Sequence, residues 1–149
     1  MTIPSPAQYV LTLDRVIDAP LANVWRCWSE PKLMEEWFCP KPWRATEVTL
    51  DLRPGGEMTS VFRGPDGESF PNAGLFLEVV PMKRIVSTDA FRAGWVPSER
   101  AYMVTETLLE EAGQGRTHMI WRAALDRRDD EGTRGDGIRS RLGRGGGAA

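Results

Sequence analysis

The single histidine is the first residue to consider for chemistry, because histidine most often transfers protons near neutral pH. His118 is the only histidine in the chain, which excludes His-rich metal sites and any catalytic triad that does not use it. It lies in an alternating segment in which Met119, Trp121 and Ala123 are expected to face inward, so we expect His118 to face outward. The sequence places no acid or nucleophile beside it, and we predict a surface histidine without a catalytic role.

The other reactive side chains are equally isolated. Cys27 and Cys39 are too few for a structural zinc site, which needs four ligands. Glu78 and Glu106 lie within predicted strands and could point a carboxylate into a cavity, but we interpret them as sheet-edge or salt-bridged acids. The segment Arg53-Pro54-Gly55-Gly56 lacks the Lys-Ser/Thr pair of a phosphate-binding loop and predicts a tight turn. We therefore predict no catalytic residue, no metal site and no cofactor.

The large apolar side chains are the most informative set for function. Aromatic residues and methionines exceed what so small a core needs, and an apolar pocket with few polar groups suits the binding of a small hydrophobic molecule. The residues that we expect to line such a cavity are Trp37, Phe38, Trp43, Phe62, Phe76, Met103, Met119 and Trp121. Each of them, taken singly, is also compatible with a place in the core.

Length and composition limit the classes of protein to consider. The chain has 149 residues, of which 41% are hydrophobic and 27% charged, and a formal net charge of -2, which suits one globular domain. This charge gives no basic field for a nucleic acid, and no apolar run approaches the roughly 20 residues that span a bilayer. We expect neither nucleic acid nor membrane as a partner. Two cysteines and the lack of a secretion signal predict a cytoplasmic protein.

Periodicity and turn signals give the order of the elements that must position these side chains. Residues 8–17 alternate as a strand, and Asp18 is placed to cap a helix that starts near Pro20 or Leu21. Apolar residues recur at helical spacing through 21–28 and 33–38, and turns divide the rest into strands. This order predicts an α+β fold with an antiparallel sheet of about six or seven strands and two short helices after the first strand.

Short motifs spread over the chain form a recognisable set. They are Asp18-Ala19-Pro20, Val24-Trp25, Trp28, Pro31, Trp37-Phe38, Arg53-Pro54-Gly55-Gly56, Asp66-Gly67, Gly74–Pro81 and Thr88. Together they resemble the C-terminal-domain family of the activator of the ninety-kilodalton heat-shock-protein ATPase, over residues 8–123. That family belongs to the START-like (SRPBCC, polyketide-cyclase-like) superfamily. The resemblance implies a helix-grip fold, in which a curved antiparallel sheet wraps a long C-terminal helix with an apolar cavity between them.

The end of the chain does not supply the helix that such a sheet needs. Two short helices cannot cover six or seven strands, each about 5 Å wide, so another element must lie on the sheet. Residues 127–149 instead hold six arginines, seven glycines and four acidic residues, too little apolar surface to fold. We expect a START-like helix-grip domain over residues 8–124 and a disordered Gly/Arg-rich tail over 125–149. No aromatic residue interleaves its arginines, which argues against RNA binding.

A shifted reading frame would explain this tail. In the family, the last strand usually runs into His-Trp-Thr, and a helix with the pattern His-Glu-x-Met-Gly-Phe-x-x-Gly-Trp follows. After a shift of one nucleotide, the overlapping codons of Ala124-Leu125-Asp126 permit His-Trp, those of 133–139 permit His-Glu-x-Met-Gly-Phe, and those of 141–143 permit Gly-Trp. We hypothesise that the chain from Ala124 onward is a frameshifted reading of this helix; a genuine truncation is the alternative.

Three functions from different classes follow from the resemblance and the aromatic set. The leading hypothesis is non-catalytic binding of a small apolar or aromatic molecule in the helix-grip cavity. The family name implies a chaperone-interaction module that activates the heat-shock-protein ATPase, and the superfamily implies an enzyme such as a polyketide cyclase or hydrolase. If the helix is missing, a homodimer is one way to cover the exposed sheet face.

The frameshift hypothesis predicts that the coding DNA around codon 124 restores the family's helix when it is read one nucleotide out of frame. A helix that buries about five large apolar side chains is worth on the order of 10 kcal/mol, and whole-domain stability is about 5–15 kcal/mol. The printed chain is therefore expected to exchange amide hydrogens rapidly and to bind hydrophobic dye. DNA without such a frame, or a highly stable cooperative monomer of the printed chain, would contradict the hypothesis.

Overall fold

The computed structural model of the chain describes residues 9–99 and 103–125. The helix that the frameshift hypothesis concerns lies outside this range, as does the predicted tail of residues 125–149 apart from Leu125, which ends the last strand. Among the described residues, no helix is long and apolar enough to cross a membrane. The elements are β1 (Tyr9–Ile17), α1 (Leu21–Ser29), α2 (Pro31–Trp37), β2 (Arg44–Leu50), β3 (Glu57–Arg63), β4 (Ser69–Val80), β5 (Arg84–Thr88), β6 (Phe91–Arg92), β7 (Val96–Pro97), β8 (Met103–Glu111) and β9 (Thr117–Leu125).

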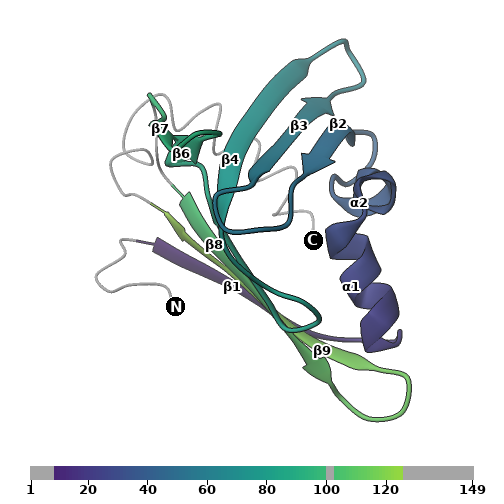
Figure 1. The fold of residues 1–149 in the computed structure, drawn as a ribbon. Coiled ribbons are helices and arrows are strands. Elements are labelled where there is room, and N and C mark those ends of the chain that lie inside the picture. Colours follow the sequence, from purple (N-terminus) through teal and green to yellow (C-terminus); the bar gives the residue numbers. More distant parts are fainter. Residues whose placement is uncertain (1–8, 100–102, 126–149) are drawn as a thin grey trace.

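One large antiparallel sheet organises the molecule. Its seven strands follow the order β1-β9-β8-β5-β4-β3-β2, and β6 and β7 form a separate pair. The large sheet curves, and α1 and α2 lie on one side of it (Figure 1). This is the predicted α+β helix-grip architecture. We name the face that carries Phe76, Ile85, Leu109 and Met119, toward the helices, the inner face, and the opposite face the outer face.

Prolines set the ends of the two helices. Pro20 is the N-cap residue of α1, with an extended backbone and no side-chain cap hydrogen bond. The predicted cap by Asp18 is therefore wrong, because Asp18 lies two residues before the position from which a side chain caps this helix. α1 ends at Ser29, and its C-cap residue Glu30 is extended because the residue before Pro31 avoids helical backbone. Pro31 then opens α2, where its missing N–H costs nothing.

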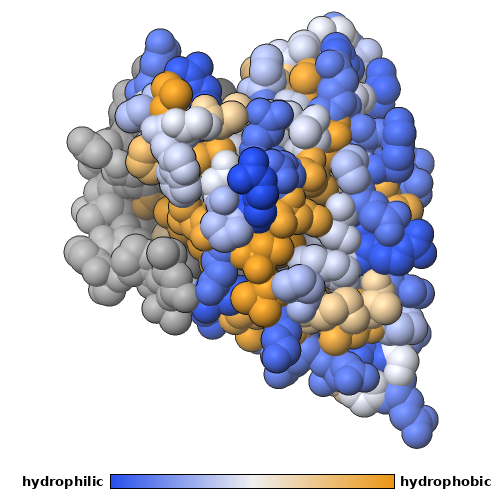
Figure 2. Space-filling model, in the orientation of Figure 1, coloured by the Kyte–Doolittle hydropathy of each residue, from blue (hydrophilic) through white to orange (hydrophobic). Residues whose placement is uncertain are grey.

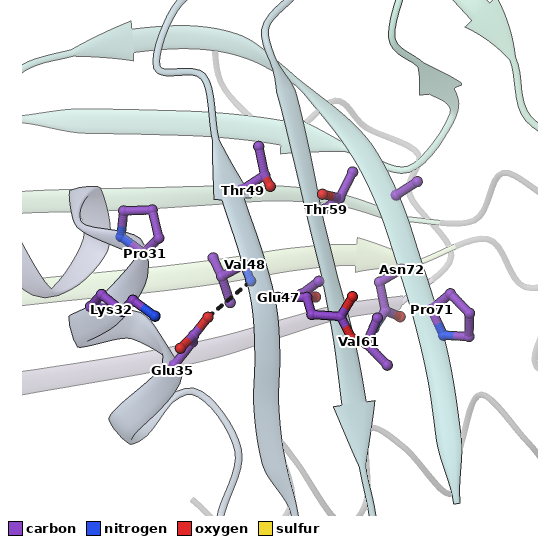
Figure 3. A pocket seen from close by; sticks show the side chains of 12 residues that line it. Pro31, Lys32, Glu35, Glu47, Val48, Thr49, Thr59, Val61, Pro71 and Asn72 are labelled. Carbon is purple, nitrogen blue, oxygen red and sulfur yellow. Dashed lines mark hydrogen bonds between the residues drawn. The ribbon is translucent and has the colours of Figure 1, made fainter.

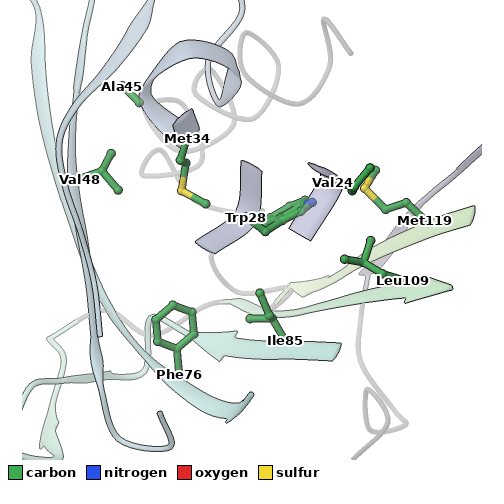
Figure 4. Close-up of a cluster of buried hydrophobic side chains, with 9 residues drawn as sticks. All are labelled: Val24, Trp28, Met34, Ala45, Val48, Phe76, Ile85, Leu109 and Met119. Atoms are coloured by element: carbon green, nitrogen blue, oxygen red, sulfur yellow. The ribbon is translucent and has the colours of Figure 1, made fainter. Parts of the chain in front are cut away.

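The core lies between the helices and the inner face. Val24 and Trp28 of α1 and Met34 of α2 are buried toward the sheet (Figure 4). Their buried partners on the strands are Ala45, Val48, Phe76, Ile85, Leu109 and Met119. Each fully buried large side chain contributes about 1.5–3 kcal/mol. This packing fixes the helices on the sheet and so limits which inner-face side chains stay accessible.

The segment Arg53-Pro54-Gly55-Gly56 is a tight turn between β2 and β3, as predicted. Gly55 has a φ of 81°, in the left-handed region that favours glycine. A Cβ on Gly56 would lie 1.9 Å from the Asp51 carbonyl oxygen. The Gly55 N–H donates to the Phe76 carbonyl oxygen at 2.8 Å, and the Phe76 N–H donates to the Gly56 carbonyl oxygen at 2.9 Å. The turn thus anchors the start of β3 against β4.

β2, at one edge of the large sheet, is interrupted by a bulge and covered by a helix. Its register against β3 shifts between Thr46 and Thr49, and Glu47 adopts a φ of 52°. The Val48 N–H donates to the carboxylate of Glu35 on α2 at 3.1 Å. α2 packs along this strand. An irregular, covered edge resists pairing with another chain.

A buried carboxylate on the outer face is held by two arginines. Glu106 of β8 is 2% exposed. Its Oε2 lies 2.6 Å from Nη2 of Arg84 on β5, and its Oε1 accepts a hydrogen bond from Nη1 of Arg122 on β9 at 3.1 Å. Arg84 Nε also lies 3.2 Å from Oε1 of Glu78 on β4. Glu78 and Glu106 are therefore salt-bridged acids, one of the two interpretations made from the sequence, and they tie together four neighbouring strands.

Replacing Glu106 by glutamine is expected to lower the free energy of unfolding by about 3 kcal/mol, because two arginines lose their buried counter-charge. Urea unfolding of Glu106→Gln measures this loss. The matched control is Glu30→Gln, which breaks the exposed ion pair with Arg26 and should change stability little. Equal effects of the two variants would refute a special role for the buried cluster.

Candidate functional site

The inner face carries apolar side chains whose alignment is set by strand register. Leu13 of β1 lies opposite Trp121 of β9, Trp121 lies opposite Thr107 of β8, and Thr107 lies opposite Ile85 of β5. Ile85 is part of the buried core, whereas Leu13 and Trp121 are only partly buried against it. This row therefore runs from the core toward the β1 edge as a half-open apolar surface.

The next row contains two hydroxyl groups among apolar neighbours. Leu11, Ala123, Thr105, Ser87 and Phe76 follow one another across β1, β9, β8, β5 and β4. The hydroxyls of Ser87 and Thr105 lie 2.6 Å apart and share a hydrogen bond. Ligand pockets commonly combine an apolar lining with a few polar groups that orient the ligand. This row has that composition.

Aromatic rings connect the helices with β3. The ring centroids of Trp28 and Trp37 lie 4.9 Å apart, and those of Trp37 and Phe38 lie 5.3 Å apart. Phe38 lies 5.9 Å from Phe62 of β3. The Trp37 ring N–H also donates to the Cys27 carbonyl oxygen at 3.0 Å. Three predicted cavity residues, Trp37, Phe38 and Phe62, thus lie in one aromatic cluster. The fourth ring of this cluster is Trp28, which lies on the predicted first helix.

The remaining predicted cavity residues are distributed over the fold. Phe76 and Met119 belong to the buried core, and Trp121 packs partly buried against it. Trp43 stacks on Phe70 with 5.7 Å between ring centroids. Met103 is partly exposed at the start of β8. The prediction that all eight residues line a single cavity stays a prediction.

Some apolar side chains of the helices and of the inner-face rows stay accessible to solvent. Trp37 is 39% exposed and Leu11 is 44% exposed. Figure 2 shows hydrophobic residues gathered through the middle of the molecule, with hydrophilic residues around them. Accessible apolar surface of this kind often marks a binding site.

A separate groove of about 630 Å³ lies at the β2 edge (Figure 3). It is lined by Pro31, Lys32 and Glu35 of α2 and by residues 47–49, 59–61 and 71–73 of β2, β3 and β4. None of the predicted cavity residues lines it. Its carboxylates are already engaged, because Glu35 accepts the Val48 N–H and Glu47 pairs with Arg63. We therefore interpret this groove as a consequence of the bulge in β2.

His118 lies on the outer face with two acids beside it. Its Nε2 lies 2.7 Å from Oδ1 of Asp14 on β1, and its Nδ1 lies 3.1 Å from Oε1 of Glu110 on β8. Hydrogen bonds to Glu110 and Asp14 raise the pKa of His118 above its ordinary value of 6.5. The outward orientation was predicted, whereas the sequence alone did not place either acid beside His118. The signal that could have indicated Glu110 is the glycine-containing turn between β8 and β9, which pairs Glu110 with His118. Asp14 is 104 residues away in sequence.

The thiols and acids give no sign of redox or metal chemistry in the described part of the chain. Cys27 and Cys39 are free and partly buried. Burial raises the pKa of Cys39 to about 11, which keeps it protonated and weakly nucleophilic near neutral pH. No group of three or more His, Cys, Asp or Glu among the described residues could hold a metal ion.

A family model described as Activator of Hsp90 ATPase homolog 1-like protein matches residues 18–143. The chain belongs to this family. The family match agrees with the helix-grip fold of the START-like superfamily seen in the sheet and helices. It continues past the last described residue, into the segment for which we predict a frameshift, and the coding DNA decides that prediction. A comparison with curated proteins found no match.

Solved structures of bacterial proteins share the fold of this family member. A protein of Nitrosomonas europaea is 38% identical, with 78% of this chain and 75% of that chain covered and a TM-score of 0.74. A protein of Rhizobium leguminosarum is 29% identical, with 91% and 90% covered and a TM-score of 0.58. A protein of Arthrobacter aurescens is 20% identical, with 91% and 80% covered and a TM-score of 0.73; this last likeness supports the fold alone.

The His118 cluster predicts a pH-dependent contribution to stability. Because the pKa of His118 is raised in the folded state, its ion pairs with Asp14 and Glu110 stabilise the fold fully below the unfolded-state pKa and lose this effect as the pH rises through the folded-state pKa. The difference in unfolding free energy between the native chain and His118→Gln should therefore be largest in mildly acidic buffer and shrink above neutral pH. A difference that grows with pH would contradict this assignment.

Proposed function

We propose that this protein binds a small apolar or aromatic molecule on the inner face of its sheet, without catalysing a reaction. The observation that carries the proposal is the half-buried apolar row that includes Leu13 and Trp121 beside the core. Contact with an apolar ligand would remove this surface from water, at about 25 cal/mol for each Å² buried. The Ser87–Thr105 hydroxyl pair in the neighbouring row supplies a polar group that can orient the ligand.

The position of the charged clusters supports binding rather than acid–base catalysis. His118 with its two acids, and Glu106 with its two arginines, belong to the alternating positions of β8 and β9 that form the outer face. A general acid or base must reach the reacting atom within hydrogen-bond distance. A ligand on the inner face would be separated from both clusters by the sheet. We infer a carrier or sequestering role, and the unpaired thiols Cys27 and Cys39 suit a reducing cytoplasm.

Replacing Trp121 by leucine is expected to weaken ligand binding about tenfold, which is about 1.4 kcal/mol, because a large aromatic contact is lost. The neutral fluorescent probe N-phenyl-1-naphthylamine, titrated into the native chain, gives the affinity, and displacement by a panel of apolar and aromatic compounds ranks ligands. Thermal shift measures the linked stabilisation of the native chain and of a frame-restored chain.

The matched control is Trp95→Leu, because Trp95 is 52% exposed and lies between β6 and β7, which form a pair separate from the large sheet. It should bind the probe like the native chain. Equal loss in both tryptophan variants would place binding elsewhere, and failure of every compound to stabilise the frame-restored chain would refute a ligand-binding function.

The family description favours a second candidate, interaction with the heat-shock-protein ATPase. That role predicts stimulation of the chaperone's ATPase by this chain, with no dependence on a small apolar ligand. The third candidate, a cyclase or hydrolase, has no independent support, since the fold alone does not specify an activity. Chaperone stimulation that Trp121→Leu leaves unchanged would favour the second candidate over the first.

A further inference from the structure

The β1 edge of the large sheet is regular, in contrast to the bulged and covered β2 edge. Tyr9–Ile17 pair with Leu125–Thr117 of β9 residue by residue, without a register shift. No strand within residues 9–99 and 103–125 pairs with the other side of β1, and the strand contains no proline. Such an edge presents N–H and C=O groups that can pair with another strand.

The side chains of β1 are also unusually apolar for an exposed edge. Val10 is 49% exposed, Leu11 44% and Val16 58%. No other strand in the described part of the chain carries as many large exposed apolar side chains. Charged side chains and bulges usually prevent strand-to-strand association at an edge, and along β1 the charges are confined to Asp14 and Arg15.

We propose that two copies of this chain associate through antiparallel pairing of their β1 strands, which joins the two sheets into one. Around a two-fold axis, residues that face each other lie on the same face of the joined sheet, so their numbers are both odd or both even. The register that pairs all of residues 9–17 places Leu13 on the axis. It puts Val10 opposite the partner's Val16, and Leu11 opposite the partner's Arg15.

Charge selects this register over its neighbours. A shift by two residues in one direction would place Asp14 directly opposite the partner's Asp14, and like charges in that position are destabilising. A shift in the other direction would leave Val16 beyond the end of the partner strand. In the proposed register Asp14 lies opposite the partner's Thr12. The remaining diagonal repulsion between the two Asp14 carboxylates is reduced, because each lies 2.7 Å from a His118 nitrogen.

The test is the mass of the chain in solution, measured by sedimentation velocity over a range of concentrations. The native chain is expected to be a dimer, and the double variant Val10→Lys, Val16→Lys is expected to sediment as a monomer at the same concentrations. Lysines would face each other at both ends of the paired strands. The control Val96→Lys changes an equally apolar residue on β7 that is 46% exposed and should remain a dimer.

Circular dichroism and urea unfolding establish that each variant keeps its fold. In the native dimer, β1 amide hydrogens should exchange more slowly as the concentration rises, which ties the association to this strand. A native chain that stays monomeric would overturn the proposal. A folded double variant that still dimerises would overturn it too, and would point to pairing over the inner face. Neither result depends on whether the protein binds a small molecule.

Discussion

Coverage of the inner face is the constraint on which the rest of this structure depends. Helices of 9 and 7 residues are only about 14 and 11 Å long at 1.5 Å per residue. Seven strands at their usual spacing make a sheet about 29 Å wide. α1 contacts β8 and α2 contacts β2, and the rings of Trp28, Phe38 and Phe62 fill space between helix and sheet. Apolar residues farther from the helices, such as Trp121, remain only partly buried.

The two edges of the sheet are stabilised differently. At β2, the bulge removes the Val48 N–H from the strand ladder, and the Glu35 carboxylate accepts a hydrogen bond from it. The helix that covers this edge therefore also satisfies the hydrogen-bond donor that the bulge leaves free. At β1, the contacts in the described residues come from β9 alone along the ladder, reinforced by His118 bound to Asp14. The first edge is closed by local structure, whereas no strand of residues 9–99 and 103–125 pairs with the outer side of the second.

Local signals in the sequence predict the elements well and their contacts poorly. Prolines and glycines mark the helix ends and the turn at Gly55-Gly56, because these residues restrict or permit backbone conformations directly. The positions of Asp14 beside His118, or of Arg84 beside Glu106, depend on which strands become neighbours and in what register. Those contacts join residues far apart in sequence, and alternation of apolar and polar residues does not reveal them. The cavity residues were chosen by type, so the set mixes core positions such as Phe76 with exposed ones such as Trp37.

The outer-face clusters and the inner-face rows belong to the same strands, and this links stability to the site. On β9, His118 and Arg122 bind acids on the outer face, while Met119 and Trp121 between them face the core. A slip of one residue would exchange the two faces of a strand and would bring Arg122 to the position of Trp121. Burying that charge on an apolar surface would be costly. The ion pairs therefore hold the register that presents the apolar row, although they touch no part of it.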